Sequence, residues 1–551
     1  MTDRAATDVK AGRPDLLPRA VLLLGAILAF GAVAGLTVLK APISAQEIAY
    51  LVKSLLYVGG QVAPYTTTDA TGDMPLYFYQ LGFWQQFKSI GIMPARALSI
   101  GFGVINGALL FFICRHLTAN TLAAAAAVFI FLGTPATAAF FAKATPTATV
   151  SALHLAAVWL IIASMGRQRP VASVAMGAIC AALYFYRQDM LLSVVALVPL
   201  YIAAIGRRRA AHTLILIAAA AVVTAAVLFA FPDKLAHYAT RLPLIAPLLE
   251  RAGWLAPNFT LIDKSSTAAV MSAFVPAHVV DGFLLPYSGT LVLALGLFAL
   301  VGGPLRILWI VPLYFFWLAA AHIFGLHEYC AGCIAAAAPY FSGIGALAAA
   351  LTLAMLAHRA RQNMIPAAPC ILIGATLAVA LNTFAPMLAL RADAKGFPIP
   401  MMVDGGSIPE SKDVETLARW INSNTPAREP MLVLHSLGAR PLPSIAFAVF
   451  LAEHPMPAQS ITPVASQRVI NPRLQGPARE AVQAALEEES LWSDATFNRW
   501  IDRDYDIVLV QGDNTPDHRA RMAVLTAKFD LAASTMYRGA VLYLYKRKAG
   551  Q

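Results

Sequence analysis

The sequence predicts a polytopic α-helical membrane protein of about eleven transmembrane helices, followed by a small α/β domain. The chain of 551 residues is 58% hydrophobic and only 13% charged, and its mean hydropathy is +0.64. This composition is typical of membrane spans and differs from that of a soluble core. The net charge of +11 does not indicate a nucleic-acid partner, because the basic residues fall in short clusters between apolar segments.

About eleven apolar segments are long enough to cross a bilayer, because a transmembrane helix needs about 20 residues. The first segment is too long for a signal peptide and no convincing cleavage site precedes Pro42, so we expect a retained helix. The expected spans are residues 19–41, 97–114, 118–140, 148–165, 171–186, 190–205, 211–231, 284–301, 307–325, 331–355 and 367–389.

The basic residues between the spans predict the orientation of the chain. Short cytoplasmic loops carry an excess of Lys and Arg, and here every second connection is basic. These clusters are Arg4, Lys10, Arg13 and Arg19 in the N-terminal tail, then Arg115-His116, Arg167 with Arg169, Arg207-Arg208-Arg209, Arg306, and His358-Arg359 with Arg361. We therefore expect a cytoplasmic N-terminus and an extracytoplasmic C-terminus. In a bacterium this describes a multi-pass inner-membrane protein with a periplasmic C-terminal domain.

Residues 391–551 have the composition of a soluble domain, in contrast to the membrane domain of residues 1–390. Helices are expected at 413–422 and 445–452, buried strands at 430–434 and 505–510, and a hairpin or strand pair at 532–545. Strands that alternate with helices predict a small α/β layer domain. His435, Ser436 and Asp506 lie near expected strand ends, but no catalytic motif accompanies them, so we expect no separate active site in this domain.

The best candidates for chemistry lie between the first two spans. This outer loop, residues 42–96, contains Gln46, Glu47, Tyr50, Asp73 and Arg96 in an otherwise apolar part of the chain. A carboxylate can act as a general base, and Arg can bind a phosphate through two parallel hydrogen bonds. The structural alternative for either carboxylate is a solvated loop residue or a helix cap.

Two further outer turns carry polar residues. Arg187 precedes Asp189 in one of them and is either a phosphate ligand or an interfacial anchor paired with that carboxylate. The other turn, His327-Glu328-Tyr329, precedes a helix that contains Pro339. Adjacent residues on one turn make a poor chelate and no Asp-x-Asp motif occurs near the first loops, so we expect no metal and no other cofactor. The less favoured alternative is a divalent metal held by His327, Glu328 and a loop carboxylate. Three lysines are weaker candidates for the phosphate and are expected instead to extend to the membrane surface: Lys53, Lys88 and Lys143.

The order of features in the first outer loop resembles the GT-C superfamily of polyprenyl-phosphate-sugar glycosyltransferases, and in particular its protein O-mannosyltransferase and aminoarabinose transferase branch. The family loop typically reads Asp-Glu, Tyr, Gly, Pro-Tyr, a Pro-Leu element and an Arg at the second helix. The corresponding residues here are Gln46-Glu47, Tyr50, Gly60, Pro64-Tyr65, Met74-Pro75-Leu76 and Arg96-Ala97-Leu98-Ser99. The leading Asp of the family, its catalytic base, is Gln46 in this chain, so either Glu47 has taken over that role or the activity is altered.

The resemblance implies a donor, an acceptor and roles for the candidate residues. The donor is a sugar linked to polyprenyl phosphate, and the acceptor is a hydroxyl of a cell-envelope lipid, glycan or protein. Glu47 is then the catalytic base with Asp73 as its support or substitute, and Arg96 and Arg187 bind the donor phosphate. Gln46, Tyr50 and the turn His327-Glu328-Tyr329 line the substrate pocket. The C-terminal domain becomes an acceptor-recognition or stabilising module.

Three other functions fit parts of the sequence. A transporter or flippase for lipid-linked sugars also has many spans, but no charged residue lies clearly at mid-bilayer depth to couple ions. A polysaccharide polymerase or ligase acts on similar lipids, although Arg-rich outer loops are expected there. A catalytically inactive homologue is consistent with Gln46. Fold analogy alone does not separate these functions.

Overall fold

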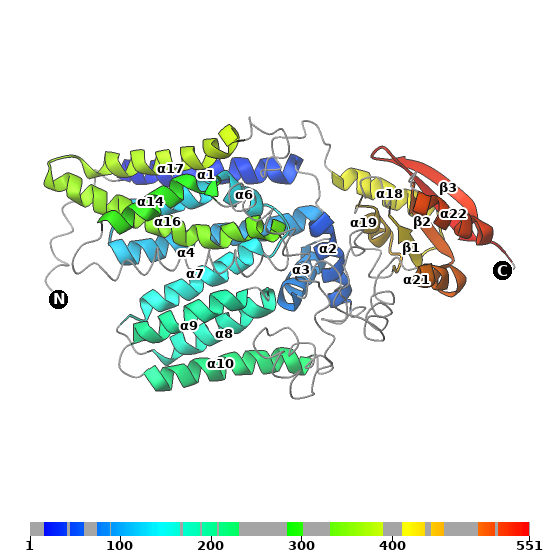
Figure 1. The fold of residues 1–551 in the computed structure, drawn as a ribbon, viewed down its shortest axis with the longest axis horizontal. Helices are drawn as coiled ribbons and strands as arrows, with labels where there is room; N and C mark the ends of the chain where they lie inside the picture. The colour runs from blue at the N-terminus through cyan, green and yellow to red at the C-terminus, as the bar shows by residue number, and fades with distance from the viewer. Residues whose placement is uncertain are drawn as a thin grey trace. The chain divides into compact units, whose positions relative to one another are not determined.

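The computed structural model shows a helical bundle and a smaller α/β part (Figure 1). It describes residues 16–40, 45–59, 74–88, 90–165, 169–187, 190–205, 209–230, 284–300, 331–389, 410–435, 442, 444–456, 494–512 and 516–549. The chain divides into two compact units. The first contains Met1–Ala41, Arg96–Ala226 and Ala268–Gly405, and the second contains Pro42–Ala95, Val227–Thr267 and Gly406–Gln551.

Helices of the first unit coincide with the expected spans wherever the structure describes them. Their bounds are α1 Leu16–Lys40, α4 Ile92–Thr118, α5 Thr121–Gly133, α6 Pro135–Phe141, α7 Thr147–Ala163, α8 Pro170–Tyr186, α9 Leu191–Ile205, α10 Arg209–Ala230, α14 Ser288–Leu300, α16 Ala331–Gln362 and α17 Ala367–Ala389. The expected span 307–325 lies outside the described residues.

The length and composition of these helices identify a multi-pass membrane protein. Among the described residues, five helices (α1, α4, α10, α16 and α17) are long and apolar enough to cross a membrane, or six spans if the bent pair α5 and α6 counts as one. Helices α7, α8 and α9 are apolar but shorter. The total of eleven spans stays a prediction.

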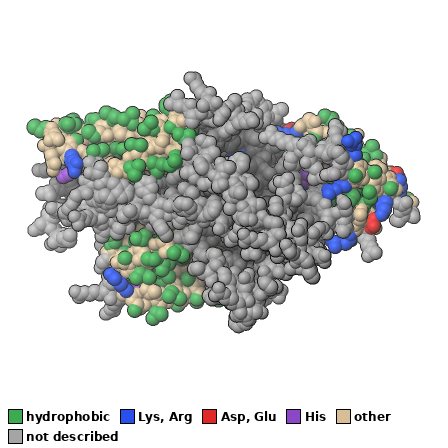
Figure 2. All heavy atoms as spheres, viewed as in Figure 1, with side chains coloured by type: hydrophobic (Ala, Val, Ile, Leu, Met, Phe, Trp, Pro, Cys, Tyr) green, Lys and Arg blue, Asp and Glu red, His purple; other side chains and the backbone are tan. Residues whose placement is uncertain are grey.

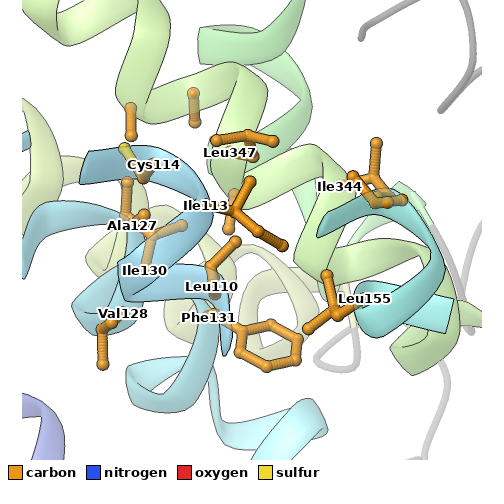
Figure 3. Packing of buried hydrophobic residues seen from close by; sticks show 14 of the residues in the cluster. Leu110, Ile113, Cys114, Ala127, Val128, Ile130, Phe131, Leu155, Ile344 and Leu347 are labelled. Carbon is orange, nitrogen blue, oxygen red and sulfur yellow. The ribbon is translucent and has the colours of Figure 1, made fainter. Parts of the chain in front are cut away.

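The core of the bundle is built from small and branched apolar residues. Ala123 to Ala127 of α5 are all buried, and this helix packs against α1, α16 and α17. Figure 3 shows the branched side chains that fill the remaining space, among them Ile113, Ile130 and Leu347. Small residues let membrane helices approach closely and make many van der Waals contacts. These contacts are a main source of attraction between the helices, because the surrounding lipid is as apolar as the protein.

The outer surface of the bundle is apolar, as a lipid-facing surface must be. Leu214 and Val222 of α10 are 67% and 68% exposed, and Figure 2 shows hydrophobic side chains spread over the described helices. One helix is broken: α5 and α6 meet at an angle of 67°. The break follows from Pro135 at the start of α6, because proline cannot continue the hydrogen bonding of the preceding helix.

The C-terminal part of the second unit is an α/β domain. Strands β1 Met431–Leu434, β2 Ile507–Gln511, β3 Phe529–Tyr537 and β4 Ala540–Arg547 form one sheet in the order β1-β2-β4-β3. Strand β1 is parallel to β2, and the other pairs are antiparallel. The helices of this domain are α18 Glu410–Asn424, α19 Ser444–Leu451, α21 Asp494–Arg499 and α22 Pro516–Lys528, and a π-helical turn lies at Trp500–Asp504. The predicted sheet and its hairpin are thereby confirmed.

The predicted outer loop contains two helices that the sequence analysis did not anticipate. These are α2 Ala45–Val58 and α3 Pro75–Lys88, and they pack against each other. Helix α2 also packs against α19 of the C-terminal domain, so the second unit joins this loop to that domain. Each helix has 14 residues, which is too short to cross a membrane and therefore escapes a search for spans.

Candidate active site

Three of the predicted site residues lie on the first two turns of α2. Glu47 is in the first turn, where the partial positive charge of a helix N-terminus stabilises a carboxylate. Its side chain is completely buried, with 0% exposure. Gln46 is part of the same turn, but its side chain lies outside the described residues. The structure thus brings Gln46 and Glu47 to the start of one helix, which is buried on several sides.

Aromatic rings surround Tyr50 on the next turn of α2. Tyr50 is 3% exposed, and its ring lies 5.7 Å from that of Tyr77 and 5.9 Å from that of Phe78, both on α3. Tyr57, two turns further along α2, lies 5.1 Å from the same Phe78 ring. An aromatic cluster of this kind excludes water and strengthens electrostatic interactions near it.

The two helices cross at a glycine. A Cβ atom on Gly82 of α3 would lie only 2.4 Å from the carbonyl oxygen of Ser54 and from a methyl group of Val58. The hydroxyl of Ser54 donates to the carbonyl of Leu51 at 2.7 Å and accepts from the side chain of Gln85 at 3.0 Å. The close approach and the buried hydrogen bonds fix the position of α2, and therefore of Glu47, relative to α3.

Lys53 of α2 is a buried cation that the sequence analysis assigned to the membrane surface. It is only 1% exposed, and its Nζ lies 5.0 Å from the ring of Phe78 and 6.0 Å from that of Tyr57. Cation–π contacts of this kind stabilise an ammonium group most strongly where water is excluded. The sequence feature that could have revealed this buried lysine is its position within Leu51-Val52-Lys53-Ser54-Leu55. A lysine among apolar residues of one helix costs free energy unless its charge has a function.

Arg96 lies at the start of the second span, as predicted, and is buried with 1% exposure. Its Nη1 donates to the carbonyls of Thr37 and Val38 at 3.1 and 3.2 Å. These carbonyls belong to the last turn of α1, where a helix has unsatisfied acceptors and a partial negative charge. Arg96 therefore stabilises the end of α1, and phosphate binding by its guanidinium stays a prediction.

Arg187 follows the last residue of α8 and contacts α16. Its Nη1 donates to the hydroxyl of Tyr340 at 2.6 Å, and its guanidinium carbon lies 5.3 Å from the centre of the same ring. Tyr340 is fully buried, next to the proline inside α16. The predicted alternative partner, Asp189, lies outside the described residues. Tyr340 thus orients Arg187, and no sequence signal linked two residues 153 positions apart.

Several predicted site residues lie outside the described residues. These are Asp73, His327, Glu328 and Tyr329. Within the described part of the chain, no group of three or more His, Cys, Asp or Glu side chains could hold a metal ion.

One polar cluster of the bundle was not predicted. Asn382 of α17 donates from Nδ2 to the hydroxyls of Thr134 and Thr290, each at 2.8 Å. Its Oδ1 accepts from the backbone amides of Gly289 and Thr290 at 2.8 and 3.2 Å, at the start of α14. The signal was an amide side chain within an apolar span, which must find partners inside the protein.

Comparison with solved structures identifies the fold over nearly the whole chain. The crystal structure of ArnT from Cupriavidus metallidurans in the apo state matches with a TM-score of 0.53 and 14% identity, over 95% of this chain and 97% of that protein. The structure of the same protein bound to undecaprenyl phosphate matches with a TM-score of 0.51 and 13% identity, over 96% and 98%. The chain has the fold of ArnT.

This likeness confirms the membrane fold that the sequence resemblance implied, with the spans first and the α/β domain last. No protein-family model and no curated protein matches the chain by sequence.

Proposed function

We propose that the protein is an integral membrane glycosyltransferase that takes a sugar from a polyprenyl-phosphate donor and transfers it, with inversion, to a hydroxyl acceptor. The observation that carries this proposal is the shared fold with ArnT from end to end. A structure of that protein holds undecaprenyl phosphate, which is a polyprenyl phosphate. The completely buried Glu47 adds a candidate base directly after Gln46, which occupies the position of the family's catalytic Asp.

In the proposed reaction Glu47 accepts the proton of the acceptor hydroxyl while that oxygen attacks the anomeric carbon of the sugar. The bond from this carbon to the phosphate oxygen breaks, and polyprenyl phosphate leaves with the bonding electron pair. A phosphate is a good leaving group, so no general acid is required on the departing oxygen. Asp73 is the second candidate for the base.

The leaving phosphate requires positive charge, which we assign to Arg187 and Arg96. The hydroxyl of Tyr340 accepts from Nη1 of Arg187 at 2.6 Å and so orients a planar guanidinium that suits a phosphate. Arg96 is committed in part to the end of α1. The acceptor is a cell-envelope lipid, glycan or protein, and the turn His327-Glu328-Tyr329 is proposed to line the donor pocket.

We further propose that the reaction takes place on the extracytoplasmic face of a bacterial inner membrane. The basic clusters between spans support this orientation. A cysteine at the exposed Ser423 of α18, in a background without the five native cysteines, tests it. A membrane-impermeant maleimide should label this site in spheroplasts without lysis. Labelling only after lysis would reverse the orientation.

The test of the function is sugar transfer from a panel of radiolabelled polyprenyl-phosphate sugars. Membranes should carry the wild type, Glu47→Gln, Asp73→Asn or the control Glu415→Gln at matched protein levels. Glu415 is exposed on α18, so its substitution should leave transfer unchanged. Transfer that is lost only with Glu47→Gln supports the enzyme and its base.

Two other outcomes change the proposal. Loss only with Asp73→Asn would move the base to Asp73. No transfer from any donor, together with flipping or binding of lipid-linked sugars by the purified protein, would favour a carrier or an inactive homologue. The observation that favours this second candidate is Gln46, which replaces the catalytic Asp of the family.

A further inference from the structure

Helix α3 exposes a row of aromatic side chains. Phe83 is 58% exposed and Phe87 is 77% exposed. The ring of Tyr79 stacks on that of Phe83, with centroids 6.1 Å apart and an interplanar angle of 25°. A spacing of four residues places Tyr79, Phe83 and Phe87 on one side of the helix. These three residues are called the aromatic ridge below.

The distribution of side chains on α3 differs from that of a helix in a soluble protein, which exposes polar residues opposite its buried side. The buried side of α3 packs on α2 through Phe78, Gly82 and Gln85. The exposed side carries the ridge, so both sides are largely apolar. The helix contains no Asp or Glu, and its one charged residue is Lys88. Exposed apolar patches of this kind mark a surface that contacts a partner or a membrane.

The ridge lies close along the chain to a helix that is long and apolar enough to cross a membrane. Helix α3 ends at Lys88, and the spanning helix α4 begins at Ile92. The indole nitrogen of Trp84 donates to the carbonyl of Pro94 at 2.7 Å, which fixes the last turn of α3 to the first turn of α4. The first turn of a spanning helix lies at the boundary of the hydrocarbon layer.

Neighbouring side chains have the chemistry of a membrane interface. Ile90 is 48% exposed and Met93 is 39% exposed, so apolar surface continues from the ridge to α4. The Nζ of Lys88 lies 5.7 Å from the ring of Trp84 and 5.2 Å from that of Phe87. Trp and Lys gather at the headgroup level of bilayers, where a ring can meet acyl chains and an ammonium can meet lipid phosphates.

From these observations we propose that the aromatic ridge is a membrane-docking surface, which inserts among the acyl chains at the bilayer boundary where α4 enters. Helix α3 then lies along the interface with Lys88 at the level of the lipid phosphates. Because Gly82 and Gln85 hold α3 against α2, docking also sets the depth of α2 and Glu47. That consequence bears on sugar transfer and rests on the proposed function, whereas docking itself does not.

The experiment measures depth by spin labelling of the full chain in vesicles of phosphatidylethanolamine and phosphatidylglycerol. Nitroxides are attached to Phe83→Cys or Phe87→Cys in a background without the five native cysteines. Collision with oxygen, which concentrates in lipid, is compared with collision with a water-soluble nickel chelate. Val222→Cys on α10 is the lipid control, and Ser423→Cys on α18 is the water control.

We expect labels at Phe83 and Phe87 to collide with oxygen at least threefold more than the label at Ser423, and to be shielded from the nickel chelate as at Val222. Nickel accessibility like that of Ser423 at both ridge positions would overturn the proposal, as would shielding from both reagents, which indicates cover by protein. Because depth is read directly, the result does not depend on whether sugar transfer is found. Two separate ridge positions keep the test decisive if one variant fails to fold.

Discussion

The helical bundle and the α2–α3 pair bury polar side chains in different ways. In the bundle, the buried amide of Asn382 meets neutral hydroxyls and backbone amides with every polar atom of its side chain. In the α2–α3 pair, the buried residues include Glu47 and Lys53, whose side chains are 0% and 1% exposed. A neutral amide with matched partners costs little to bury, whereas a charge is expensive even when it has partners.

The difference separates positions that hold the fold from positions that suit chemistry. The neutral cluster around Asn382 joins helices, and the polar atoms of this side chain are already hydrogen-bonded within the protein, so they are not available to a substrate. Buried ionisable groups in a membrane protein, by contrast, usually serve function. The comparison predicts that substitutions that remove a charge from the α2–α3 pair lower the rate of sugar transfer and leave stability unchanged. Substitutions at Asn382 should instead lower the stability of the fold.

The largest effect should come from Glu47→Gln, which keeps the shape of the side chain and removes the base. We expect the rate of sugar transfer to fall by about 10²–10⁴, with a thermal unfolding midpoint in detergent at or above that of the wild type. Initial rates with a saturating lipid donor and a differential scanning measurement on the same preparation check this. An unfolding midpoint well below that of the wild type, together with the loss of rate, would remove the distinction between the two regions.

Asn382→Ala should have the opposite profile. It removes the hydrogen bonds of Asn382 to the hydroxyls of Thr134 and Thr290 and to two backbone amides, so we expect the free energy of unfolding to fall by about 1–3 kcal/mol. Reversible unfolding in mixed micelles measures this. Thr383→Ala is the matched control, because its hydroxyl bonds to Val379 of its own helix. Equal stability of both variants would contradict the assigned role of Asn382.

Gly82→Ala tests whether the crossing of α2 and α3 is as tight as the geometry indicates. The new methyl group would meet the backbone of Ser54 at 2.4 Å, so the helices must separate at a cost of about 1–3 kcal/mol. Hydrogen exchange of the α2 amides should increase. Gly35→Ala in α1, where the added Cβ meets no atom of another element within 4 Å, should leave exchange there unchanged. Unchanged protection of α2 after Gly82→Ala would show a looser crossing.

The smallest effect is expected for Tyr340→Phe, which removes the acceptor of Arg187 and keeps the ring beside it. Loss of one hydrogen bond to a charged group is worth about 1.5–3 kcal/mol at most and less where the site can relax, so we expect KM for the lipid donor to rise about tenfold with kcat nearly constant. Tyr201→Phe is the control, because its hydroxyl contacts Ser173 instead. A change in kcat alone would place Tyr340 outside donor binding.

Much of the architecture could be predicted because it follows from local patterns. Continuous apolar segments predicted the bundle helices, and alternating strand and helix signals predicted the elements of the C-terminal sheet. The short helices α2 and α3 were missed, since neither is long enough to register as a span and each is stabilised by its neighbours. The pairing of residues 42–95 with the C-terminal domain was also missed, because contacts such as that of α2 with α19 join parts of the chain far apart in sequence.

Sequence alone identified Glu47, Arg96 and Arg187 as candidates, because charged residues are rare in so apolar a chain and their types match the chemistry of phosphate and proton transfer. Tertiary structure alone decided their surroundings. It buried Glu47 and Lys53 between helices, directed Arg96 to the carbonyls of α1, and joined Arg187 to Tyr340. Local periodicity determines which residues form a helix and which side is apolar. The burial of a charge and the partner of a guanidinium depend on which distant helices pack together.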